Sequence, residues 1–165
     1  MKTLILTKGT VATVDDEWYD VLSQHKWHLF TKGYAARSVK INGRKRNIFM
    51  HREIIGISAD DKRIVDNIDG NKLNNCTSNL RVCDAFQNMH NRDVQRNNTS
   101  GRKGINWHKK KKVWQARIKS YGKRIFLGNF KTIDEAHEVY CLAADLLHGE
   151  FANYGRRALL EGAKQ

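Results

Sequence analysis

"VDNIDGNKLNN", the stretch from Val65 to Asn75, decides the fold that the sequence predicts for the middle of this chain. Its Asp-Gly pair favours a tight turn, and its asparagines can hydrogen bond to nearby backbone groups, so the stretch predicts a polar hairpin. It also offers oxygen atoms of the kind that hard cations prefer. The residues alone leave two interpretations open: a turn whose polar groups serve local structure, and a metal site that acts on phosphodiesters.

The chemistry of phosphodiester hydrolysis indicates which residues could take part in such a site. The reaction needs a hard cation at the scissile phosphate and a base that activates water. Asp66 could supply a carboxylate oxygen, and Asn88, on a following helix, could supply an amide oxygen. Mg²⁺ keeps most of its own waters, so these two ligands would suffice. Asn79 could brace the loop by hydrogen bonds to backbone groups.

The rest of the first hundred residues predicts short strands and short helices. A helical turn at 15–24 is expected to be capped by Asp15 or Asp16, and a helix should run from Met50 to Gly56. A further helix is predicted over 84–92, and the polar segment 93–103 is expected to be a linker. Strands are predicted at 3–7, 10–14, 26–30, 34–41 and 46–51.

Beyond residue 103 the pattern predicts three strands and one amphipathic helix. The strands are expected at 104–108, 113–119 and 124–130, where apolar and polar residues alternate. The helix is expected over 133–149, with a capping box of Thr132 and Glu135. We therefore predict an α+β chain: a β-rich N-terminal segment with a hairpin and helix, a linker, and a three-stranded antiparallel sheet packed on one helix.

Alternation also sorts the residues of this second sheet into two faces. The face expected to pack on the helix holds Ile105, Trp107, Trp114, Ala116, Ile118, Ile125 and Leu127. The opposite, polar face holds Asn106, His108, Gln115, Arg117, Lys119, Arg124 and Phe126. A twisted sheet can enter the major groove of DNA, where Arg reads guanine and Gln or Asn reads adenine. The turn of Lys109 to Lys112 would meet phosphates, and Lys103, Lys110 and Lys112 are expected to bind DNA; a merely solvated face is the alternative.

The overall charge supports a polyanionic partner. Among 165 residues, 30 lysines and arginines face 17 aspartates and glutamates, for a formal charge of +13, and residues 101–165 hold 14 of the basic and 6 of the acidic ones. Neutralising phosphates releases their condensed counterions, which favours nucleic acid; a basic protein without such a partner is the alternative. Three cysteines without a CxxC pair indicate reduced thiols and no structural zinc. Neither a membrane span nor a secretory signal is predicted.

The segment "VDNIDGNKLNNCTSNLRVCDAFQNMHNR" resembles the HNH homing endonucleases, which share a ββα-metal fold. The matching residues are Val65, Asp66, Asp69, Gly70, Asn71, Asn74, Asn75, Ser78, Asn79, Leu80, Arg81, Gln87, Asn88 and Asn91. Upstream, "MHREIIG" is similar to a helix that precedes the motif in phage members. The resemblance implies an endonuclease domain over 1–92 with its ββα-metal motif at 62–92.

The same resemblance implies roles for individual residues. Asp66 and Asn88 would bind one divalent ion, Mg²⁺ or Mn²⁺; Asn79 would brace the loop, and Arg81 would lie near a phosphate. His51 would support the site or form a structural hydrogen bond. The family places its general base, a histidine, where this chain has Asn67, and a neutral amide cannot accept the proton. A deliberate substitution, which the otherwise intact motif favours, and natural decay are the two explanations. His90 should point away and not replace the base.

Residues 100–155 closely resemble the ethylene-response-factor (APETALA-two) DNA-binding domain, which implies groove binding through the sheet. The features that carry this are Lys103-Gly104-Ile105, Trp107, Trp114, Ala116-Arg117-Ile118, Leu127-Gly128-Asn129-Phe130, Ala136, Tyr140, Ala143-Ala144 and His148-Gly149-Glu150. Asn106, His108 and Lys119 replace arginines of plant members, so base preference does not carry over. The implied domain spans 104–154, and 155–165 would form a C-terminal tail.

Taken together, these observations predict an HNH homing endonuclease of phage type that hydrolyses duplex DNA and is severely impaired by Asn67. Its place would be the cytoplasm of a bacterial host, without a membrane or a small-molecule substrate as partner. The alternatives are a non-catalytic, sequence-specific DNA-binding regulator and an RNA-binding accessory factor.

Overall fold

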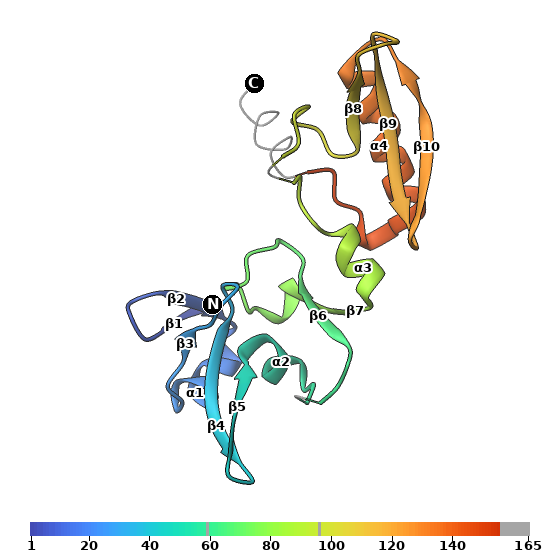
Figure 1. Cartoon of the computed structure of the whole chain (residues 1–165). Helices are drawn as coiled ribbons and strands as arrows, with labels where there is room; N and C mark the ends of the chain where they lie inside the picture. The colour runs from blue at the N-terminus through green and yellow to red at the C-terminus, as the bar shows by residue number, and fades with distance from the viewer. Residues whose placement is uncertain (59, 96, 156–165) are drawn as a thin grey trace. The chain divides into compact units, whose positions relative to one another are not determined.

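The computed structural model describes residues 1–58, 60–95 and 97–155 (Figure 1). The chain is a mixed α/β protein with several small antiparallel sheets and few helices, as the sequence predicts at that level. It consists of two units, Met1–Asp84 and a second that begins at Ala85. The expected domain limits of 1–92, 93–103 and 104–154 stay a prediction. Apart from Gly155, the expected tail at 155–165 lies outside the described residues.

The first unit is built on short sheets. Strands β1 (Lys2–Ile5) and β2 (Val11–Val14) form one pair, and a three-stranded sheet has the order β3-β4-β5. Helix α1 (Asp16–Ser23) and helix α2 (Met50–Ile55) complete it, and α2 ends at Gly56 in the left-handed region. The strands of the larger sheet are β3 (His28–Leu29), β4 (Ala35–Ile41) and β5 (Arg44–Phe49).

The hairpin of the opening stretch is fixed to the core of this unit. Strand β6 (Ile64–Asn67) pairs with β7 (Leu80–Cys83), and a 3₁₀ turn, η1 (Thr77–Asn79), precedes β7. Val65 and Leu80 enter the hydrophobic core. Asp15 is the N-cap of α1 but makes no side-chain cap bond; its carboxylate instead accepts hydrogen bonds of 2.7 Å from the amide and hydroxyl of Thr77. The expected cap is thus used to tie η1 to the start of α1.

The second unit contains α3 (Ala85–His90), one sheet and a long helix. Strands β8 (Ile105–His108), β9 (Val113–Ser120) and β10 (Lys123–Phe130) form an antiparallel sheet in the order β10-β9-β8, followed by α4 (Ile133–His148) and η2 (Gly149–Phe151) (Figure 1). The expected capping box at the start of α4 is present, and Gly149 is its C-cap. The helix packs on the sheet through a core of Ile105, Ala116, Ile118, Ala136, Tyr140 and Ala144.

Two details differ from simple alternation. Trp107 is 45% exposed and packs on Trp114, and Ile125 is 37% exposed, although both were expected under the helix. They lie on the edge strands, and a helix about 10 Å wide covers about two strands spaced 4.8 Å apart. The register also shifts between Phe126 and Gly128, which marks a β-bulge.

No described helix is long and apolar enough to cross a bilayer.

Candidate metal site and nucleic-acid interface

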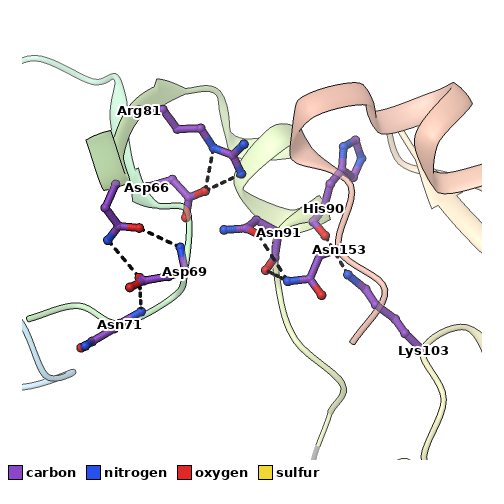
Figure 2. A network of polar contacts seen from close by, with 9 residues as sticks. Asp66, Asp69, Asn71, Arg81, His90, Asn91, Lys103 and Asn153 are labelled. Carbon is purple, nitrogen blue, oxygen red and sulfur yellow. Dashed lines mark hydrogen bonds and ion pairs between the residues drawn. The ribbon is translucent and has the colours of Figure 1, made fainter. Parts of the chain in front are cut away.

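The loop between β6 and β7 is held closed by its own polar side chains. The amide oxygen of Asn79 accepts from the backbone N–H of Asp69 at 2.9 Å. The Asn79 amide nitrogen donates to the Asp69 carboxylate at 2.9 Å and to the Asn74 carbonyl at 2.8 Å. The same carboxylate accepts from the Asn71 backbone at 2.7 Å, a contact that Figure 2 draws. Asn79, a buried residue, therefore joins the turn to the strand that follows it.

Asp66, the expected metal ligand, faces a cation from its own hairpin. Arg81 lies directly opposite it on β7, and its Nε and terminal nitrogen donate to Asp66 Oδ2 at 3.2 and 3.0 Å (Figure 2). Asp66 and Arg81 are largely buried, with side chains 10% and 12% exposed. A guanidinium thus neutralises the carboxylate, and Arg81 is placed next to a candidate ligand.

A divalent ion at Asp66 would rely on few protein ligands. The described residues contain no group of three or more His, Cys, Asp or Glu that could hold a metal. The Asp69 carboxylate is occupied by the turn. The available chemistry is one carboxylate, amide oxygens and water, which fits Mg²⁺ better than Zn²⁺. Asn88 is half-buried on α3 in the other unit, so its sharing of an ion with Asp66 stays a prediction.

The residue after Asp66 has the wrong chemistry for a base. Asn67 is 3% exposed, and its amide nitrogen donates to the Asn74 carbonyl at 2.9 Å. This contact uses the side chain to hold the loop, and a neutral amide cannot accept a proton near neutral pH. The structure therefore gives Asn67 a contact that braces the loop.

The two histidines considered as helpers are packed against other rings. His90 stacks on His148, with ring centres 3.7 Å apart and planes 11° apart. Burial, with His90 as a second cause, lowers the pKa of His148 to about 4. His51 packs on Tyr34, and burial lowers its pKa to about 4 as well. The buried His51 Nδ1 has no hydrogen-bond partner within the described chain, so the structural hydrogen bond expected for it is not seen at that atom.

The register of the second sheet places the expected polar residues on one face. Asn106 pairs with Gln115, Arg117 with Phe126 and Lys119 with Arg124, so their side chains point to the same side. Gln115 differs from the others because it is buried. Beyond the bulge the alternation is reversed, and Asn129 joins this face opposite Gln115. We call Asn106, Gln115, Arg117, Lys119, Arg124, Phe126 and Asn129 the polar sheet face.

Asn129 is the residue that sequence reasoning missed. Strict alternation places it with Ile125 on the helix side. An isolated glycine within a strand signals a bulge, and Gly128, at φ 149°, carried that signal. Its Cβ would stand 2.9 Å from the Phe130 ring, which explains why a glycine is needed there.

A cleft of about 630 Å³ lies beside the polar sheet face, within the second unit. Its basic lining residues are Arg92, Lys103, Arg117, Lys119 and Arg124, and Asp93 is the one acidic residue among the described lining. Lys119 and Arg124 sit directly opposite each other, and neither has an acidic partner in the described part of the chain. Like charges in such cross-strand pairs destabilise a sheet.

The remaining expected contacts are distributed around the sheet. Lys110 and Lys112 are exposed in the β8–β9 turn, where the Lys112 amide donates to the His108 carbonyl at 2.8 Å. The Lys111 amide donates to His108 Nδ1 at 3.1 Å, which orients that ring. Lys103 donates from Nζ to the His90 carbonyl at 2.7 Å (Figure 2), so its ammonium is partly engaged by α3.

Two known proteins are similar to the chain. One is the uncharacterized HNH endonuclease L560 of Acanthamoeba polyphaga mimivirus, 32% identical over 145 residues, which cover 88% of this chain and 74% of that protein. The other is Protein 3.8 of Escherichia phage T7, 32% identical over 90 residues, which cover 54% of this chain and 74% of that protein. No protein-family model and no solved structure matches the chain.

Proposed function

Because the chain belongs to the HNH endonuclease family, we propose that it is a metal-dependent endonuclease of the homing type that hydrolyses phosphodiester bonds in duplex DNA. The similarity to the mimivirus protein over 88% of the chain carries this proposal. The Asp66 carboxylate in the braced hairpin and the basic polar sheet face support it. Its place of action would be the cytoplasm of a bacterial host.

Asp66 is the residue that we propose as the first metal ligand, with Asn88 as the second and ββα-metal geometry for the motif. A bound Mg²⁺ or Mn²⁺ would supply a Lewis acid for the scissile phosphate. Without a metal, Arg81 donates hydrogen bonds to the Asp66 carboxylate. A DNA phosphate close to the hairpin would compete with Asp66 for the Arg81 guanidinium. The ion pair is thus compatible with a ligand that becomes available when the substrate arrives.

Asn67 stands where this mechanism needs a base, so we propose that the chain is severely impaired in cleavage. Loss of a general base costs about 10²–10⁴-fold in rate. The second unit, which we propose as an ethylene-response-factor-like domain, would still bind DNA through the polar sheet face. Such binding raises the effective concentration of substrate at the weak catalytic site.

Cleavage of duplex DNA by Asn67→His in Mg²⁺ or Mn²⁺ tests the proposal. We expect cleavage to rise by about 10²–10⁴-fold over the unchanged chain, because an imidazole can accept the proton from water. The control combines Asn67→His with Asp66→Ala, which should abolish the gain. Absence of any gain with the Asp66 carboxylate in place would remove the nuclease proposal.

A non-catalytic, sequence-specific DNA-binding protein is the second candidate. The contact of Asn67 with the Asn74 carbonyl favours it, since the side chain at the base position has a structural use. This candidate predicts that the unchanged chain and Asn67→His bind the same duplex with equal affinity and that neither cleaves it. Gel-shift and cleavage measurements on the same DNA separate the two functions.

A further inference from the structure

Three side chains of the polar sheet face form a connected row. The Gln115 amide nitrogen donates to Asn129 Oδ1 at 2.9 Å. A terminal nitrogen of Arg117 donates to Gln115 Oε1 at 3.0 Å. The row therefore begins on β10 at the bulge, crosses to β9 and ends at a guanidinium.

Gln115 is in the wrong position to read a base. It is only 9% exposed, whereas Arg117 and Asn129 are exposed. Both ends of its amide are already occupied by neighbours. Reading adenine needs the amide nitrogen and oxygen together, presented to a base edge. A buried and doubly bonded amide is suited instead to orienting the group beside it.

Arg117, unlike Gln115, is placed to contact a base. Its guanidinium lies over the Phe126 ring, 5.9 Å from the ring centre, and is bonded on one side to Gln115. Arginine carries five N–H donors, and within the described chain Gln115 is its one side-chain hydrogen-bond partner. Arg117 is exposed, so its remaining donors are accessible to a ligand. A flat group held at two places is preorganised for the two acceptors of a guanine edge.

We propose that Arg117 reads a guanine in the major groove and that Gln115 and Asn129 are positioning residues that hold its guanidinium for this contact. The proposal rests on the DNA-binding function proposed above. It assigns specificity to the row, whereas Lys119 and Arg124 at the cleft would bind phosphate at any sequence. Holding the side chain in advance spares the ordering cost that a mobile arginine would meet on binding.

The first test measures, in the protein without DNA, whether the Arg117 side chain is ordered. In the full chain, ¹⁵N relaxation of the Arg117 Nε–H group should report an ordered side chain. Gln115→Met removes the amide at similar length and should make that group mobile, whereas Asn129→Asp keeps the oxygen acceptor and should leave it ordered. A mobile Arg117 in the unchanged chain, or one that Gln115→Met does not loosen, overturns the row as a positioning device whatever the protein binds.

Binding specificity gives the second test. Duplexes selected by the full chain from random DNA are compared with versions changed at each base pair. Arg117→Ala should lower discrimination at one G·C pair by at least about fivefold. Gln115→Met and Asn129→Ala should weaken discrimination at that same pair, with no further loss in the double variant Arg117→Ala/Gln115→Met. Lys119→Gln is the matched control and should weaken all sequences equally.

The outcomes separate the two proposals. An ordered Arg117 in a chain that selects no duplex removes the DNA-binding function and the reading role with it. Duplex binding in which Gln115→Met keeps full discrimination, or loses it at a pair other than the Arg117 pair, overturns the positioning role alone. Thermal unfolding of each variant shows whether a loss arises from a damaged fold, and Asn129→Asp should restore what Asn129→Ala loses.

Discussion

At the scale of single residues, the ion pair between Asp66 and Arg81 dominates the candidate catalytic hairpin. Two largely buried charges attract strongly, and removal of one takes away this attraction while the other keeps the cost of its burial. Arg81→Ala should therefore destabilise the first unit by about 3 kcal/mol. It should also make the Asp66 carboxylate a better cation ligand, because no guanidinium competes for it.

Thermal unfolding with and without Mn²⁺ measures this effect. Mn²⁺ should raise the Tm of Arg81→Ala more than that of the unchanged chain, since a ligand that binds the folded state stabilises it. Asp66→Ala/Arg81→Ala is the control and should show no Mn²⁺-dependent shift. Equal shifts in all three proteins would contradict Asp66 as a metal ligand.

The second prediction concerns how much Asn79 stabilises the loop between β6 and β7. Asn79→Ala removes the side chain that makes three hydrogen bonds to Asp69 and Asn74, so it should cost about 2 kcal/mol. Asn71→Ala, at an exposed position in the same loop, should cost well under half as much. Urea unfolding gives the two values, and equal costs would argue against Asn79 as the main brace.

Local chemistry explains which of these residues the sequence could identify. Asp69 and Asn79 have side chains that bond to backbone in turns, so their use is visible from the residue types. The Asp66–Arg81 pair depends on which residues face each other across β6 and β7. That register is set by the packing of Val65 and Leu80 into the core, and the sequence pattern does not give it.

At the scale of elements, the start of β8 depends on one close approach. Gly104 has φ 73°, and an added Cβ would lie 2.3 Å from the Tyr140 ring and 2.5 Å from the Arg117 carbonyl. Gly104→Ala should therefore destabilise the second unit by more than about 3 kcal/mol, because α4 and β9 must move apart. Loss of the folded fraction in urea or heat measures it.

Gly101 provides the matched control for this substitution. It has the same φ of 73°, but a Cβ there meets nothing within 4 Å among the described residues. Gly101→Ala should cost only the backbone term of about 1 kcal/mol. If the two variants were equally stable, the contact with Tyr140 would not constrain the packing of the helix on the sheet.

Elements with strong local signals were predicted well, and those shaped by packing were not. The capping box gave the start of α4, and alternating residues gave β8, β9 and β10 nearly to their ends. The bulge after Phe126 was missed because strict alternation was applied across Gly128, although an isolated glycine within a strand signals a bulge. The exposure of Trp107 was missed because it depends on how far α4 extends across the sheet.

At the scale of the whole molecule, His51 in the first unit and His148 in the second link stability to pH. His51 and His148 have ordinary pKa values of 6.5 that burial lowers to about 4 in the folded chain. The unfolded chain therefore binds protons first as pH falls. Stability should be full above pH 6.5 and decrease between about pH 6.5 and 4, on the order of 2 kcal/mol per histidine.

Urea unfolding at several pH values measures this dependence. His148→Gln cannot gain a charge, so its stability should fall less steeply over that range than that of the unchanged chain. A parallel fall in the two proteins would show that His148 contributes nothing to the acid sensitivity.

The charge of the whole chain gives the last prediction, on the salt dependence of DNA binding. With a formal charge of +13 and a cleft lined by five basic residues, the affinity should fall steeply as salt displaces phosphate contacts. A plot of log K against log salt has a slope of about −0.9 for each phosphate neutralised. Lys119→Gln should make that slope shallower by about 1, because Lys119 lies on the polar sheet face beside the cleft. Lys131→Gln makes the same change in charge beyond the end of β10, outside that face, and should leave the slope unchanged. If both variants altered the slope equally, the contact would come from net charge and not from the sheet.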